Sequence, residues 1–199
     1  MELSNNQLKH FETVKKLFIA GQINKLEDIF DVCTLSDFYL LLKMSNSERF
    51  KNKILYPKKF RIWEVETICE QFNISINIFL QLVNMYSSQN NGEPVFLFTH
   101  EKERIDYLKQ FNFKSYHIKR LNDLRLKYKL NQIHTIDDIF SICMWVDIHP
   151  NATEATRTQL RKKFKEPSKL RLSEISLISA TTGIKYTELI EIIRNSTFS

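Results

Sequence analysis

Two segments of the sequence concentrate side chains that bind anions. Residues 47–61 (SERFKNKILYPKKFR) hold six basic residues and one acidic residue, and residues 156–172 (TRTQLRKKFKEPSKLRL) hold seven and one. The whole chain has 29 Lys and Arg against 23 Asp and Glu, so the remainder carries 16 basic and 21 acidic residues. The formal net charge of +6 therefore comes from local excesses of +5 and +6 over a remainder of −5. Cations at this density favour a polyanionic partner such as nucleic acid.

Helical spacing separates these charges from the apolar residues beside them. Phe50 and Ile54 fall on one face of a helix, as do Leu160 and Phe164, which leaves basic and amide side chains on the other faces. A helix anchored in this way fits the major groove of DNA, where cations meet phosphates and amides or Arg reach base edges. The alternative is a solvated basic face without a ligand.

The DNA-binding hypothesis assigns contacts to basic and amide residues of the two segments. The candidate base-contacting residues are Lys51, Asn52, Gln159 and Arg161. The candidate phosphate-contacting residues are Lys53, Lys58, Lys59, Arg61, Lys162, Lys163, Lys169 and Arg171, and the DNA-binding set also includes Arg49 and Arg157. Arg61 and Arg171 stand where a helix cap is expected, so each either clamps a phosphate at a helix N-terminus or is a solvated side chain.

The chain also repeats itself at an offset of 110 residues. Residues 8–83 placed on 118–193 without a gap give 15 identities in 76 positions, and the identities cluster around 22–33 with 132–143 and around 53–64 with 163–174. The polar stretch 84–94 (NMYSSQNNGEP) separates the repeats. We therefore expect a first domain at 1–84, a linker at 85–111 and a second domain at 112–199.

Apolar spacing predicts an all-α fold, with about five short helices in each copy. Apolar residues recur at intervals of three and four in 65–72, 76–83 and 175–193. The linker is expected to contain a helix at Thr99–Phe111, capped by Thr99. The best strand candidate is Val95–Phe98, which is equally a linker segment packed on a core.

The run from Ala155 (ATRTQLRKKFKEPSKLRLSEISLISATTGIKYTELIEII) resembles the later helices of phage-repressor-like, Xre-type helix-turn-helix domains. The matching run in the first copy is Asn46–Val83. The resemblance implies a supporting helix at Ser36–Leu42, a turn at 43–45 and a recognition helix ending at Leu55. The first copy departs from the family pattern because Tyr39 replaces a small residue and the turn lacks Gly. In the second copy Pro150 and Asn151 interrupt the supporting segment, so 147–152 is expected to be loop.

Residue types needed for other chemistry are scarce or badly spaced. Three glycines, Gly21, Gly92 and Gly183, exclude a P-loop and a GxGxxG turn. Five histidines form no HxxxH pair and none lies near a Cys at zinc-ligand spacing, so no metal or other cofactor is expected. Asp28 and Asp138 fit first-turn acids of helices rather than a general acid or base. The expectation is a protein that is not an enzyme.

Three widely spaced cysteines, Cys33, Cys69 and Cys143, fit core thiols in a reducing cytoplasm. The N-terminal residues lack the apolar core of a signal peptide, and no run is long enough to span a membrane. We therefore expect a cytoplasmic protein that binds double-stranded DNA, with other proteins as further possible partners and no membrane. It would act as a transcriptional or mobile-element regulator. The alternative is a helical protein–protein interaction module that does not bind DNA.

Overall fold

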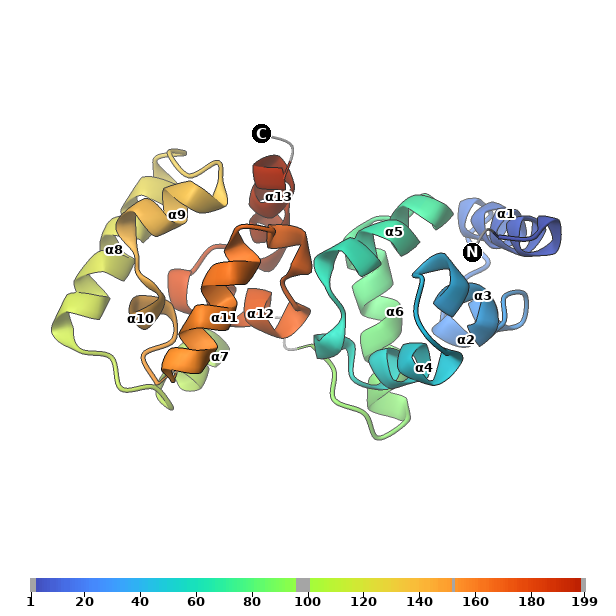
Figure 1. The fold of residues 1–199 in the computed structure, drawn as a ribbon, viewed down its shortest axis with the longest axis horizontal. Coiled ribbons are helices and arrows are strands. Elements are labelled where there is room, and N and C mark those ends of the chain that lie inside the picture. Colours follow the sequence, from blue (N-terminus) through green and yellow to red (C-terminus); the bar gives the residue numbers. More distant parts are fainter. Residues whose placement is uncertain (1–2, 96–100, 152, 198–199) are drawn as a thin grey trace. The chain divides into compact units, whose positions relative to one another are not determined.

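The computed structural model describes residues 3–95, 101–151 and 153–197, apart from the side chains of 101, 154, 155, 157 and 197. These residues form α-helices and two short 3-10 helices and no strand, which confirms the all-α prediction (Figure 1). Of the strand candidate, Val95 is not in a strand and 96–98 lie outside the described residues, as does Thr99. The chain divides into two compact units, Met1–Val95 (unit 1) and Phe96–Ser199 (unit 2).

The helices of unit 1 are α1 (Asn5–Ile19), α2 (Leu26–Phe30), α3 (Leu35–Leu41), α4 (Ser47–Leu55), the 3-10 helix η1 (Pro57–Lys59), α5 (Ile62–Phe72) and α6 (Ile76–Gln89). Those of unit 2 are α7 (Glu101–Leu108), α8 (Ser115–Lys129), α9 (Ile136–Ile142), α10 (Trp145–Ile148), α11 (Glu154–Phe164), η2 (Pro167–Lys169), α12 (Leu172–Thr182) and α13 (Tyr186–Thr197). The predicted linker thus begins inside α6, and its expected helix is α7.

Aromatic rings form the core of unit 1. The ring of Phe38 on α3 stacks on that of Phe50 on α4, with centroids 4.6 Å apart and planes 5° apart. Phe11 on α1 and Phe72 on α5 meet Phe38 edge to face. All four side chains are fully buried. Because buried aromatic pairs add stabilisation beyond their area, this cluster fixes α4 against the rest of the unit.

Helix α12 lies at the centre of unit 2, and arginines cover its C-terminal end. Every side chain from Ile175 to Thr182 is buried. Arg125 of α8 donates to the carbonyls of Thr181 (2.8 Å) and Thr182 (3.1 Å), and Arg104 of α7 donates to that of Ala180 (2.8 Å). Carbonyls at a helix C-terminus have no partner within the helix and carry partial negative charge. The helix of the predicted linker therefore has a structural role in unit 2.

Elements of the two units recur at the offset found in the sequence. The bounds of α8, η2 and α12 each lie 110 residues after those of α1, η1 and α5. One difference is that α3 has seven residues whereas α10 has four. Pro150 explains the difference, because proline disfavours helical geometry in the residue before it, and His149 has φ −134° and ψ 76°. The expected loop at 147–152 therefore begins after Ile148.

Carboxylates at helix N-termini recur as well. Asp28 accepts from the amides of Asn24 (2.8 Å) and Lys25 (3.0 Å), and Asp138 from those of His134 (2.9 Å) and Thr135 (2.8 Å). These backbone hydrogen bonds lower the pKa of both carboxyls. The first-turn role predicted for these two acids is confirmed.

A second pair of acids joins α1 to α3 in unit 1 and α8 to α10 in unit 2. Asp37 of α3 accepts from the Thr34 amide (2.8 Å) and meets His10 Nδ1 of α1 at 3.1 Å. Asp147 of α10 accepts from the Met144 amide (2.6 Å) and meets Arg120 of α8 at 3.1 Å. Both carboxylates are buried.

The environment of Asp37 predicts acid sensitivity. Burial alone would raise the pKa of Asp37, but hydrogen bonds from Thr34, His10 and Gln7 outweigh it and hold the pKa below its ordinary value. A lowered folded-state pKa stabilises the fold above the unfolded-state value of about 3.9, and the stabilisation is lost as pH falls through the folded-state value. We expect the thermal midpoint, followed by circular dichroism, to fall between about pH 5 and pH 3 more steeply in the wild type than in Asp37→Asn. Thermal midpoints of the wild type and Asp37→Asn that fall in parallel as pH decreases would contradict this role of Asp37.

Candidate nucleic-acid interface

Helix α4 is positioned by its cap and by two buried side chains. The Asn46 side chain accepts from the Arg49 amide at 3.0 Å and starts the helix. Phe50 and Ile54 are each 1% exposed and pack towards α3 and α6. The turn from α3 contains Lys43 in the left-handed region, with φ 50°. The segment expected as a supporting helix, 36–42, is helical up to Leu41, and the expected recognition helix ends at Leu55 as α4 does. Arg49, Lys51 and Asn52 are exposed on α4.

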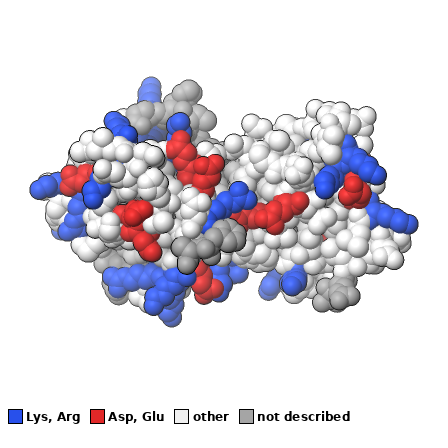
Figure 2. All heavy atoms as spheres, turned by 90° about the horizontal axis from the view of Figure 1, so that it is seen from above, with Lys and Arg blue, Asp and Glu red and all other residues white. Residues whose placement is uncertain are grey.

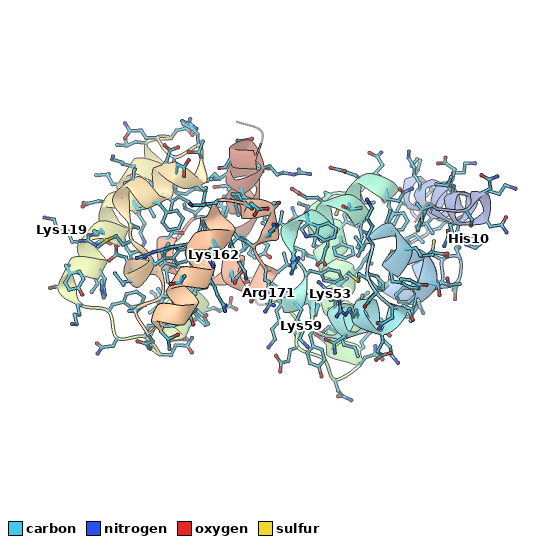
Figure 3. All side chains as sticks on the ribbon, viewed as in Figure 1. His10, Lys53, Lys59, Lys119, Lys162 and Arg171 are labelled. Carbon is cyan, nitrogen blue, oxygen red and sulfur yellow. The ribbon has the colours of Figure 1, made fainter. Side chains whose placement is uncertain are left out.

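Helix α11 has a similar placement in unit 2. Thr153 caps it by accepting from the Thr156 amide at 3.2 Å. Leu160 is 5% exposed and anchors the helix, whereas Gln159, Arg161 and Lys162 are exposed. Figure 3 shows Lys162 on this helix. The side chain of Arg157 lies outside the described residues.

Lys53 is an exception among the predicted contacts, because a carboxylate of unit 1 already binds it. Its Nζ lies 2.5 Å from Oε2 of Glu64 on α5 and 3.2 Å from the Lys59 carbonyl. The same Glu64 oxygen accepts from the Arg61 amide at 2.7 Å, at the N-terminus of α5. Glu64 is 4% exposed. One buried carboxylate therefore joins α4 to the start of α5, and Lys53 is directed inward.

The same arrangement recurs in unit 2. Lys163 of α11 forms an ion pair with Glu174 of α12, and Glu174 accepts from the Arg171 amide at 2.7 Å. Both members of the pair are partly buried. We call Lys53–Glu64 and Lys163–Glu174 the carboxylate clamps. Sequence reasoning missed their function, although a Lys followed eleven residues later by a Glu, in both repeats, was a signal for it.

Three further lysines of the predicted set also have partners. Lys58 pairs with Glu93, and Lys169 with Glu166. Lys59 donates to the Asn52 side-chain carbonyl at 2.7 Å and lies 4.3 Å from the centroid of the Tyr56 ring. Figure 3 labels Lys53 and Lys59 in this part of unit 1. These interactions lower the number of basic side chains free to meet a phosphate.

The remaining cations of both segments are exposed. Within the part of the chain that the structure describes, seven basic residues of the two segments form no ion pair: Arg49, Lys51, Arg61, Arg161, Lys162, Lys165 and Arg171. Lys165 was not in the predicted set, although the same basic segment contains it. Within each unit, on the face drawn in Figure 2, Lys and Arg stand among Asp and Glu. Of the seven cations, Arg49 and Lys51 lie on α4, and Arg161 and Lys162 lie on α11.

The described residues give little support for a metal site, a reactive thiol or a membrane-spanning helix. They contain no cluster of three or more His, Cys, Asp or Glu that would hold a metal ion. Burial raises the pKa of the Cys33 and Cys143 thiols to about 12, which disfavours the reactive thiolate. None of the described helices combines the length and the apolar character needed to cross a bilayer.

The clamps predict that neighbouring lysines differ in their effect on stability. Lys53→Met leaves the buried Glu64 carboxylate without its cation, and we expect it to lower the free energy of unfolding by roughly 1–3 kcal/mol. Lys51→Met, on the exposed face of the same helix, is the matched control and should change it by less than about 0.5 kcal/mol. Urea unfolding followed by circular dichroism measures both. Equal effects would show that Lys53 is not a structural residue.

Comparison with models of protein families, with curated proteins and with solved structures finds no match to this chain.

Proposed function

We propose that this chain binds double-stranded DNA through α4 and α11. The observation that carries the proposal is that each helix is held from behind by apolar residues and a carboxylate clamp, while cations and an amide face outward. The major groove is about 12 Å wide and admits a helix of this kind. Helices held in one orientation lose little conformational entropy on binding, so their contacts contribute to affinity more fully.

The free side chains define a smaller contact set than the sequence suggested. We assign Arg49, Lys162 and Lys165 to phosphates, together with Arg61 and Arg171, which stand at the N-termini of α5 and α12. Lys51, Asn52, Gln159 and Arg161 remain the candidate base contacts. Lys53 and Lys163 are left out because the clamps need them.

Asn52 has a particular constraint. Its side-chain carbonyl accepts from Lys59 at 2.7 Å, which leaves the amide NH₂ and the second lone pair of the carbonyl oxygen free. An Asn that reads adenine uses both its carbonyl and its NH₂. Bidentate reading of adenine by Asn52 therefore has to share the carbonyl oxygen with Lys59, unless Lys59 moves to a phosphate.

We further propose that the two units are copies of one Xre-like helix-turn-helix fold and that the protein is a transcriptional or mobile-element regulator. Support for the duplication comes from helix bounds and contacts that recur at an offset of 110, including the clamps and the pairs His10–Asp37 and Arg120–Asp147. A chain with two such units has two reading helices, as a homodimer of single units has.

Binding to random-sequence duplex DNA, measured by fluorescence anisotropy, tests the proposal. If the five cations assigned to phosphates all make their contacts, affinity should fall by roughly five-hundredfold between about 50 and 200 mM salt. The variant Arg161→Gln/Lys162→Gln should bind more weakly and should reduce the slope of log affinity against log salt by about 0.9, because Lys162 is the member of the pair assigned to a phosphate.

The matched control is Lys119→Gln/Lys127→Gln, which removes the same charge from exposed positions on α8. It should keep the wild-type salt slope. An equal loss of affinity in both double variants would mean that binding depends on the net charge of the chain and not on the positions of the charges. A chain that does not bind at low salt would instead support the protein-interaction alternative.

A further inference from the structure

Unit 2 contains an open pocket that DNA binding does not explain. Its volume is about 730 Å³, within the range of sites that bind ligands. Residues of α9, α10, α11, η2 and α13 line it. The walls are mainly apolar, and two cations, Arg161 and Lys165, and one acid, Asp137, reach it.

Three aromatic rings form one side of this pocket. The centroid of the Trp145 ring lies 4.2 Å from that of Phe164 and 5.0 Å from that of Phe140, and Phe140 and Phe164 lie 4.3 Å apart. Met144, at the edge, is 52% exposed. Arg161 and Lys165 form no ion pair with any described residue. The pocket thus offers aromatic surface beside unpaired positive charge, which suits an aromatic group near a carboxylate.

In unit 1, a side chain of α6 occupies the position that corresponds to this pocket. There the ring of Tyr86 meets that of Phe30 edge to face, with centroids 6.1 Å apart. The residue 110 positions after Tyr86 is Ser196, which lines the pocket. The Ser196 hydroxyl accepts from the Ile136 amide at 2.7 Å and donates to the Ile192 carbonyl at 2.8 Å. A small side chain bonded to backbone therefore stands where unit 1 has an aromatic ring.

The segment after α6 also packs on unit 1. After α6, the Glu93 amide donates to the Leu55 carbonyl at 3.0 Å, and the Glu93 carboxylate pairs with Lys58. Val95 is buried, and its backbone makes two hydrogen bonds to the Asn84 side chain, at 2.9 and 3.2 Å. Lys165, which lines the pocket of unit 2, lies 110 residues after Leu55. Unit 1 thus shows the kind of group that fits such a place: an aromatic ring and an extended segment with an acid.

We propose that the pocket of unit 2 binds an extended peptide segment of a partner protein, one that places an aromatic side chain near a carboxylate. The aromatic ring packs against Phe140, Trp145 and Phe164, as Tyr86 packs on Phe30. The carboxylate meets Arg161 and Lys165, as Glu93 meets Lys58. This site is distinct from the proposed DNA contacts, except that Arg161 and Lys165 belong to both.

The test begins with selection from a display library of random dodecapeptides on the full-length protein. Enriched peptides are then titrated while Trp145 fluorescence is followed in a Trp63→Phe background, in which Trp145 is the remaining tryptophan. We expect enriched peptides to share an aromatic residue close to Asp or Glu and to change the fluorescence of Trp145. Arg161→Gln should weaken their binding by about tenfold, as expected for loss of one charged hydrogen bond.

The decisive variant is Ser196→Tyr, which places in unit 2 the ring that closes unit 1. It should abolish peptide binding and preserve helical content and cooperative unfolding, both measured by circular dichroism. If Ser196→Tyr does not fold, Met144→Asp at the exposed edge serves instead, because its charge repels the peptide carboxylate. Failure to enrich any peptide, or enriched peptides that bind Ser196→Tyr and Met144→Asp as well as the wild type, would overturn the proposal. Loss of DNA binding alone would not affect it.

Discussion

A glutamate, buried in unit 1 and partly buried in unit 2, holds α4 to α5 and α11 to α12. Glu64 binds the Lys53 ammonium and the Arg61 amide with the same oxygen, and Glu174 binds Lys163 and the Arg171 amide. The carboxylate therefore satisfies a helix N-terminus and sets the rotation of α4 or α11 at the same time. Because Phe50 and Ile54 are buried beside the clamp on the inward side of α4, that helix has one orientation in which its remaining polar residues face solvent.

This constraint divides the positive charge of the chain into two groups. Lys53, Lys163, Lys58 and Lys169 neutralise glutamates of their own unit, whereas residues such as Lys51 and Arg161 do not. A net charge of +6 on a protein of this size says little about a partner by itself. The positive charge becomes informative about a partner once the cations paired with glutamates are counted separately from those exposed on α4 and α11.

Local features of the sequence predicted much of the fold. Spacing of apolar residues predicted α4 and the buried positions of Phe50, Ile54 and Leu160, and acids before apolar runs predicted the capping by Asp28 and Asp138. Residue type alone did not predict which lysines are engaged, because Lys51 and Lys53 differ only in the helix face that meets α5. The pocket was also beyond local reasoning, since it depends on Ser196 standing where unit 1 has Tyr86, between helices distant in sequence.

In the proposed complex, the outward faces of α4 and α11 meet DNA while the carboxylate clamps stay intact. Nuclear magnetic resonance of the isotope-labelled chain titrated with duplex DNA measures this most directly. We expect the largest amide shifts in α4 and α11 and unchanged ammonium signals of Lys53 and Lys163. Shifts centred on other helices, or loss of the clamp signals on binding, would show that DNA binds elsewhere or that the clamps open.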